Sequence, residues 1–301
     1  MNYLIIGSKG FIGSHLMAHL INRGEKVWGA DVIVDYTDAE RYFLVDASNS
    51  DFHSIFENQH FDICVNCSGA ASVPDSIQHP MRDYYLNAVN VFKILDSIRI
   101  YQSDCKFINL SSAAVYGNPT SLPIREDTVA CPVSPYGLHK YQSEQVCSEF
   151  YHYFNIKTCS LRVFSAYGDG LRKQLFWDIY QKAKTGIPFT LFGTGNESRD
   201  FIHVNDIVNA IDLVSKSDYF KADVINLANG EEIYIKDAVA TFFNSFSTNI
   251  NYSFSKEERK GDPVNWVADI SKLKSLGYKS TFNLETGLQQ YYKWITLKEK
   301  K

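Results

Sequence analysis

The stretch that decides the fold is Gly7-Ser8-Lys9-Gly10-Phe11-Ile12-Gly13, which joins the apolar run at residues 3–6 to an amphipathic segment at residues 11–23. The run predicts a buried strand, and the segment predicts a helix because its apolar residues recur at helical spacing. Glycines at such a turn let the backbone approach a pyrophosphate, and the helix N-terminus offers unpaired N–H groups and a partial positive charge. The stretch therefore predicts a dinucleotide-binding turn.

The acid that follows these glycines bears on which dinucleotide is bound. The spacing is G-x-x-G-x-x-G, one residue longer in its first gap than the common pattern. Asp31 ends the next predicted strand, residues 26–31. A carboxylate at this place accepts hydrogen bonds from both ribose hydroxyls of adenosine and repels a 2′-phosphate, so we predict NAD rather than NADP.

Strands and helices alternate outward from this turn. The strands are expected at residues 3–7, 26–31, 41–47, 61–69, 106–112 and 157–165, with long helices at about 80–101 and 134–153. Strands separated by helices pair in parallel through right-handed crossovers. We predict an α/β fold, a Rossmann-type doubly wound parallel sheet with a smaller C-terminal α/β substrate domain. Residues 1–165 would form the NAD-binding domain, joined by 203–228, and residues 166–301 mainly the substrate domain.

Composition excludes several classes of function. Thirty basic residues against 34 acidic ones give a net charge of −4, which argues against bulk binding of nucleic acid or an anionic membrane. No apolar run approaches the roughly 20 residues of a membrane span. The beginning of the chain does not resemble a secretion signal, so we expect a cytoplasmic protein.

Six cysteines without framework spacing suit a reducing compartment. Cys64-x-x-Cys67 resembles half of a zinc or redox site, but residues three apart on a strand point to opposite faces. We expect buried structural cysteines and no metal.

Two strand ends supply further candidates for the cofactor site. Cys67-Ser68-Gly69 closes the strand expected at 61–69, and small residues there let a dinucleotide lie across the sheet edge. Asp46 closes the strand expected at 41–47. It either accepts a hydrogen bond from the adenine amino group or is only a turn residue, since Asp is common in such turns.

The candidate catalytic residues are Ser112, Tyr136 and Lys140. Ser112 ends a strand, and Tyr136 and Lys140 share one face at the start of a helix. An ammonium beside a phenol lowers the tyrosine pKa from its free value near 10. Such a tyrosine is a general base toward a sugar hydroxyl, and Ser112 can bond the same oxygen. Tyr-x-x-x-Lys alone is commonly a surface pair, but here it follows a nucleotide turn and a serine-ended strand.

These motifs together resemble the NAD-dependent epimerase/dehydratase family of extended short-chain dehydrogenases/reductases. The closest similarity is to nucleotide-sugar 4-epimerases of the UDP-galactose 4-epimerase type. The resemblance spans nearly the whole chain and includes "GSKGFIG", "FDICVNCSGAASV", "YYLNAVNVFKIL", "LSSAAVYG", "SPYGLHK", "LRVFSAYG", "FGTGNESRDFIHVNDIVNAI" and "RKGDPVNWVADISKLKSLGY". The motifs are specific for the family and much less specific for the substrate.

The resemblance implies a role for each matching residue. The cofactor would contact Gly7, Gly10, Phe11, Ile12, Gly13, Asp31, Asp46, Ala47, Asn87, Tyr136, Lys140 and Phe164. The substrate would contact Ser112, Ser165, Arg199, Arg259 and Trp266. Guanidinium forks suit a diphosphate, although an isolated arginine is ordinarily a surface ion pair. Trp266 would border the 2-substituent of the sugar, or it is a core residue facing away from the site.

Some positions depart from the family pattern. Asn66 stands where the family often has His, and Ser165 where it often has Asn. The 4,6-dehydratases carry an acidic pair where this chain has Ala113 and Ala114. Alanine cannot move protons, so we expect no dehydratase activity.

The function implied is a nucleotide-sugar 4-epimerase that binds NAD and a nucleotide-diphosphate sugar. One alternative is a 4-keto nucleotide-sugar reductase, which would use the same residues once. Another is a non-catalytic NAD-sensing protein on the same fold. The resemblance also implies a homodimer through the helices at 80–101 and 134–153, although their apolar faces equally fit packing on the sheet.

Overall fold

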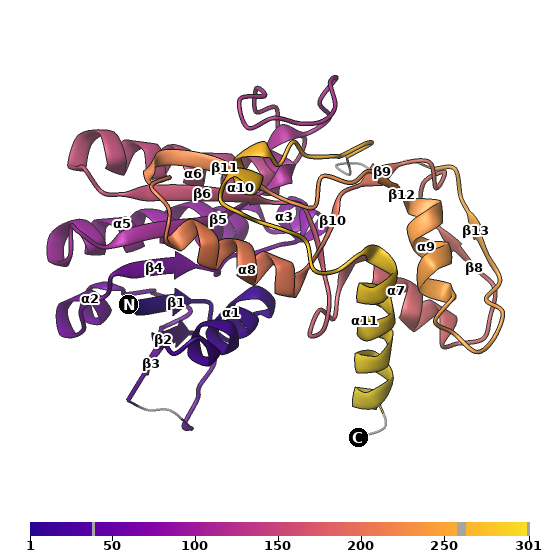
Figure 1. Cartoon of the computed structure of the whole chain (residues 1–301), viewed down its shortest axis with the longest axis horizontal. Coiled ribbons are helices and arrows are strands. Elements are labelled where there is room, and N and C mark those ends of the chain that lie inside the picture. The colour runs from indigo at the N-terminus through magenta and orange to yellow at the C-terminus, as the bar shows by residue number, and fades with distance from the viewer. Residues whose placement is uncertain (38–39, 258–262, 300–301) are drawn as a thin grey trace.

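A seven-stranded parallel sheet forms the centre of the computed structural model, which describes residues 1–37, 40–257 and 263–299 (Figure 1). The strand order is β3-β2-β1-β4-β5-β6-β11, and every neighbouring pair is parallel. The strands are β1 (Asn2–Ile6), β2 (Lys26–Asp31), β3 (Tyr42–Leu44), β4 (Ile63–Asn66), β5 (Lys106–Ser112), β6 (Thr158–Val163) and β11 (Lys221–Leu227). The predicted doubly wound α/β fold is confirmed.

Helices cover both faces of this sheet. On one face lie α1 (Phe11–Asn22) and α8 (Val204–Ser215), and on the other lie α2 (His53–Asn58), α5 (Asn90–Tyr101) and α6 (Pro135–Phe154). The residues of β1 alternate between them, since Tyr3 and Ile5 pack in the first apolar cluster and Leu4 and Ile6 in the second. This alternation is the two-residue period of a strand buried on both faces.

The helix expected at 80–101 contains a change of winding. It consists of α4 (Pro80–Tyr84), a π-helical turn η1 (Tyr85–Val89) and then α5. A π-turn admits one extra residue per turn and is often found at functional sites. Here it carries Asn87, which is 1% exposed.

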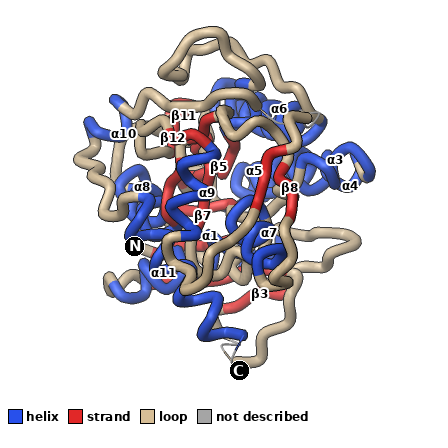
Figure 2. The backbone as a smooth tube through the Cα atoms, turned by 90° about the vertical axis from the view of Figure 1, so that its right-hand side faces the viewer, coloured by secondary structure: helices blue, strands red, loops and turns tan. Residues whose placement is uncertain are grey.

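The C-terminal part forms a smaller unit on the side of the molecule that faces the viewer in Figure 2, and its side chains form a core of their own. Its helices are α7 (Gln174–Ala183), α9 (Ile235–Phe243) and α11 (Leu284–Glu299), with the short helix α10 (Ser271–Ser275) nearby. The strand pairs are β7 (Ser165–Tyr167) with β10 (Phe201–His203), β8 (Phe189–Leu191) with β13 (Tyr252–Phe254), and β9 (Ser198–Arg199) with β12 (Ile233–Tyr234). Apolar side chains of these helices and strands pack together in a third cluster. The intervening α8 and β11 pack with the large sheet instead.

The two cysteines of the Cys-x-x-Cys pattern lie on opposite sides of the sheet. Cys64 is fully buried in the cluster beneath α5, whereas Cys67 is partly buried against the cluster beneath α1. Burial raises the pKa of both thiols, to about 12 for Cys67. The opposite orientation predicted for this pair is confirmed.

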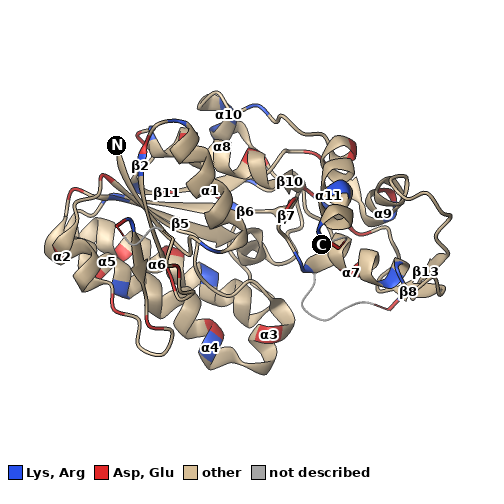
Figure 3. Cartoon of the chain, turned by 90° about the horizontal axis from the view of Figure 1, so that it is seen from below, with Lys and Arg blue, Asp and Glu red and all other residues tan. Residues whose placement is uncertain are grey.

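Charges of both signs are interspersed over the described part of the chain (Figure 3). Within residues 1–37, 40–257 and 263–299, we find no helix that is long and apolar enough to cross a membrane.

Candidate functional site

The glycine-rich turn packs tightly against the loop that follows β4. Gly7 has a φ of +80°, and a Cβ at this position would lie 2.7 Å from the backbone nitrogen of Ser68. A Cβ on Gly13 would lie 2.1 Å from the carbonyl oxygen of Gly7. Gly10 is the N-cap of α1 and has no side chain that could bond the N–H groups of the first turn, Phe11 and Ile12 among them. This turn brings bare backbone to the helix N-terminus, as a bound pyrophosphate requires.

Asp31 lies against this turn at the end of β2. Its Oδ2 accepts a hydrogen bond from the backbone nitrogen of Lys9 at 2.8 Å, and its Oδ1 accepts one from that of Val32 at 2.7 Å. These bonds fix a half-buried carboxylate beside the glycines. Asp31 thus lies directly beside the glycine turn, where the sequence predicts the ribose acceptor.

Asp46 lies beyond the end of its strand. The strand predicted over residues 41–47 ends at Leu44, so both Asp46 and Ala47 lie in an exposed loop. Asp46 Oδ1 accepts bonds from the nitrogen and hydroxyl of Ser48, at 2.7 and 2.6 Å. Side chains that bond their own following backbone compete with strand pairing, which explains the shorter strand. The hydrogen bonds of a turn residue are therefore present at Asp46.

The loop after β4 lies close to two polar side chains. Its Gly69 is near Asn87 and Lys140. A Cβ built on Gly69 would lie 2.5 Å from Asn87 Oδ1 and 3.4 Å from Lys140 Nζ. Neither polar atom of the buried Asn87 amide has a hydrogen-bond partner among the described residues. An unpartnered buried amide is costly. Together with the tight glycine turn, it fits a site that holds a dinucleotide.

The catalytic candidates follow along the same edge. Ser112 Oγ accepts a hydrogen bond from the nitrogen of Ala114 at 3.2 Å, which leaves the hydroxyl hydrogen to donate. Tyr136 lies in the first turn of α6, and its backbone nitrogen donates to Ser76 Oγ at 3.1 Å. Lys140 Nζ donates to the carbonyl oxygen of Leu110 at 2.9 Å. The ammonium is therefore anchored to β5.

The expectation that Lys140 lowers the tyrosine pKa is wrong for the protein by itself. Burial raises the pKa of Tyr136, and a hydrogen bond with Ser112 opposes that rise. Burial lowers the pKa of Lys140 to about 8, and the charge of Asp83 opposes this most strongly. The physical reason is that burial disfavours the charged form of each group, the phenolate of Tyr136 and the ammonium of Lys140.

A buried acid–base pair behind these residues was not predicted. His139 Nδ1 lies 2.6 Å from Asp83 Oδ1, and the Asp83 side chain is fully buried. His139 directly precedes Lys140 in the sequence, whereas Asp83 comes from α4. The sequence pattern could not predict this contact, because Asp83 and His139 are 56 positions apart.

The cofactor candidate Phe164 and the substrate candidates Trp266 and Arg199 lie next to one another. The rings of Trp266 and Phe164 are T-shaped with centroids 6.0 Å apart, and the Arg199 guanidinium lies 5.7 Å from the centroid of the Trp266 ring. Trp266 is 8% exposed, and its Nε1 donates to the carbonyl oxygen of Gly117 at 2.9 Å. Half-buried Ser165 follows Phe164, and Arg259 lies outside the described residues.

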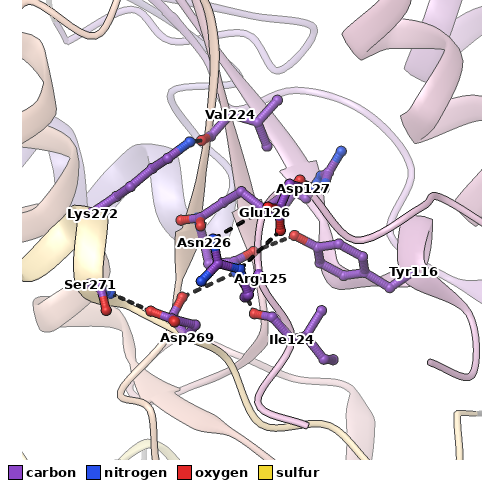
Figure 4. Close-up of polar contacts among 11 residues, drawn as sticks. Tyr116, Ile124, Arg125, Glu126, Asp127, Val224, Asn226, Asp269, Ser271 and Lys272 are labelled. Carbon is purple, nitrogen blue, oxygen red and sulfur yellow. Dashed lines mark hydrogen bonds and ion pairs between the residues drawn. The ribbon is translucent and has the colours of Figure 1, made fainter. Parts of the chain in front are cut away.

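A hydrogen-bonded cluster around Asn226 ties the segment that carries Trp266 to the sheet (Figure 4). On β11, Asn226 Oδ1 accepts from the Tyr116 hydroxyl at 2.6 Å. Its Nδ2 donates to the carbonyl oxygens of Ile124 and Asp269, at 2.9 and 3.1 Å. The cluster thereby holds the loop after β5 and the chain around residue 269 in one place. Asn226 was not among the predicted residues because all its partners are distant in the sequence.

Gly7, Asp31, Cys67, Ser112 and Phe164 end or directly follow β1, β2, β4, β5 and β6, so these candidates lie at the carboxyl edge of the sheet. Ligands of doubly wound folds bind at this edge. Asp46 and Ala47 lie at its exposed end, beyond β3.

Comparisons with known proteins agree with this site. The model of the NAD dependent epimerase/dehydratase family matches residues 3–228. The UDP-glucose 4-epimerase of Lactobacillus helveticus is 28% identical over 98% of this chain and 97% of its own.

Two solved structures share the whole fold. A UDP-N-acetylglucosamine 4-epimerase from Methanobrevibacter ruminantium, in complex with UDP-N-acetylmuramic acid, has a TM-score of 0.88 at 27% identity, covering 99% of this chain and 98% of its own. A UDP-glucuronic acid 4-epimerase from Bacillus cereus, with UDP-glucuronic acid and NAD, has a TM-score of 0.88 at 26% identity, covering 99% of both. The resemblance drawn from the sequence is confirmed, and the chain belongs to the NAD-dependent epimerase/dehydratase family.

Proposed function

We propose that this chain is a nucleotide-sugar 4-epimerase that works with bound NAD. The observation that carries the proposal is the meeting of Lys140, Gly69 and Asn87 at the sheet edge. This contact supports the proposal because Lys140 of α6 comes close to the loop after β4, against which Gly7 of the glycine turn also packs. The similar proteins named above, which are 4-epimerases of UDP-sugars, support the same function.

The residues would divide the chemistry among them. The glycine turn and Asp31 would hold NAD, which would supply reversible hydride chemistry at C4 of the sugar. Tyr136 accepts the proton of the 4-hydroxyl group and gives it back in the second half of the reaction. Ser112 donates a hydrogen bond to the same oxygen, and Lys140 of α6, anchored to Leu110 of β5, orients the cofactor. Residues 166–301 would form most of the substrate domain, with Arg199 and Arg259 at the diphosphate and Ser165 near the sugar.

The test is incubation of the protein with a panel of UDP-, GDP-, dTDP- and CDP-sugars, followed by NMR of the C4 stereochemistry. We expect inversion at C4 with no net oxidation and with NAD retained through purification. Net consumption of a reduced cofactor would instead indicate a 4-keto reductase. Binding of NAD without turnover of any sugar would indicate an NAD-sensing protein.

Replacing Asp31 is expected to weaken NAD and relax the discrimination against NADP. The Asp31→Ala variant loses both the ribose acceptor and the charge that repels a 2′-phosphate. Isothermal titration with each dinucleotide measures the change, and Asp51→Ala, an exposed acid outside the glycine turn, is the control. The prediction fails if the wild type already prefers NADP.

Trp266 is expected to restrict the size of the sugar. Trp266 is buried at the edge of the core cluster, and its contacts with Phe164 and Arg199 support a position beside the 2-substituent. Overpacking a fitted site costs about 1–3 kcal/mol, so plain hexose or pentose nucleotides should be preferred over 2-acetamido forms by roughly tenfold to a hundredfold. Trp266→Ser should narrow that gap.

Trp266→Phe is the control for this effect, because it also loses the bond to Gly117 but keeps an aromatic ring. The measurement is kcat/KM for a hexose nucleotide and its 2-acetamido counterpart. Equal values in the wild type would reject the size restriction and leave the epimerase proposal intact.

We also propose a homodimer through α4–α5 and α6. Large apolar side chains are exposed there, namely Met81, Tyr85, Phe92, Leu138 and Phe154. Light scattering after size-exclusion chromatography should give about twice the 34.3 kDa of one chain. Phe92→Glu should give the single-chain mass, whereas Leu297→Glu on α11 should not. A single-chain mass for the wild type would contradict the proposal.

A further inference from the structure

An ion pair lies immediately beside the carboxylate proposed to hold the adenosine ribose. The backbone nitrogen of Lys9 donates to Asp31, while the Lys9 ammonium pairs with Asp35 in the loop after β2. The Lys9 side chain is 36% exposed and the Asp35 side chain 12%. One residue of the glycine turn thus contacts two acids, one through its backbone and one through its side chain.

The local structure holds Asp35 in place for this contact. Its Oδ1 accepts hydrogen bonds from the nitrogen and hydroxyl of Thr37, at 2.8 and 2.5 Å, and Oδ2 accepts from Lys9. The bond from Lys9 and then those from Thr37 hold the pKa of Asp35 well below its usual range. The Lys9 ammonium also lies 5.1 Å from the centroid of the Tyr42 ring. The Tyr42 hydroxyl donates to the carbonyl oxygen of Ile33, which links β3 to the loop after β2.

This arrangement matters for a cofactor that carries a 2′-phosphate. Such a phosphate on a ribose at Asp31 would come next to Lys9, and a lysine ammonium is a good phosphate partner. In this structure the ammonium already has a carboxylate partner. A phosphate would have to compete with Asp35 for Lys9 while being repelled by both acids.

We propose that Asp35 determines dinucleotide specificity by keeping Lys9 from binding a 2′-phosphate. The inference rests on the proposed placement of the adenosine ribose at Asp31. NADP is then rejected twice: Asp31 repels the phosphate directly, and Asp35 occupies the cation that would otherwise offset the repulsion.

The test uses Asp35→Asn in the full chain, freed of bound nucleotide and titrated with NAD and with NADP. Asparagine keeps an oxygen for Thr37 but loses the charge that holds Lys9. We expect NADP to bind about tenfold more tightly than to the wild type, as a newly available lysine on a phosphate would give. The affinity for NAD should remain within about twofold because its ribose carries no such charge.

Two further variants separate this effect from a general change of charge. Lys9→Met combined with Asp35→Asn should lose the gain in NADP affinity. Asp104→Asn removes one negative charge beside the amino end of β5 and should change neither affinity.

An equal gain for both dinucleotides in Asp35→Asn, no gain for NADP, or a gain that survives the loss of Lys9 would overturn the inference. A wild type that binds no NAD would overturn the proposed function on which it rests.

Discussion

Tyr136→Phe is expected to reduce turnover by about 10²–10⁴-fold, the usual contribution of a general acid–base group. The variant loses only the phenol oxygen, so the ring still packs at the start of α6. The backbone bond from residue 136 to Ser76 is unaffected. We therefore expect normal NAD binding and an unchanged fold, with the loss confined to kcat.

The measurement is kcat for C4 inversion on the sugar identified by the NMR panel. Tyr141→Phe is the matched control, because Tyr141 is a partly buried tyrosine five residues further along the same helix. It should retain near-normal turnover. Near-normal turnover of Tyr136→Phe would remove the central mechanistic proposal.

Local sequence chemistry was sufficient to predict the frame of the site. The strand β1, the glycine turn and α1 follow directly from an apolar run, three glycines and an amphipathic segment. β1 begins and ends one residue earlier than predicted, and α1 begins at the predicted residue and ends one residue earlier. Residues 26–31 and 106–112 form strands with the predicted limits. These elements could be predicted because each depends on neighbours in the sequence.

Features that depend on distant contacts could not be predicted. The indole of Trp266 is fixed by Gly117, Phe164 and Arg199, each more than 60 residues away. The direction of the Tyr136 pKa shift depends on burial, which helical spacing does not report. The π-helical turn around Asn87 could not be predicted either, because the spacing of apolar residues does not distinguish a π-helical turn from an α-helical one.

We expect a buried ion pair between α6 and the sheet to contribute strongly to the free energy of unfolding. Arg162 on β6 forms two bonds with Glu144 on α6, at 2.7 and 2.9 Å, and both side chains are 5% exposed. Ser111 also donates to this carboxylate, at 2.5 Å. The Arg162 guanidinium lies 4.5 Å from the centroid of the Tyr116 ring. Glu144 lies one helical turn beyond Lys140, so this pair joins α6 to the sheet.

Arg162→Leu is expected to lower the free energy of unfolding by about 3–5 kcal/mol, because Glu144 would remain buried with its charge uncompensated. Denaturant unfolding measures the loss. Replacing both partners by Leu should restore much of it, since two apolar side chains leave no buried charge. The exposed pair Arg125–Asp127 provides the control. Arg125→Leu should leave stability nearly unchanged because water already screens that charge. If Arg162→Leu were no more damaging than Arg125→Leu, burial would not be what makes the Arg162–Glu144 pair important.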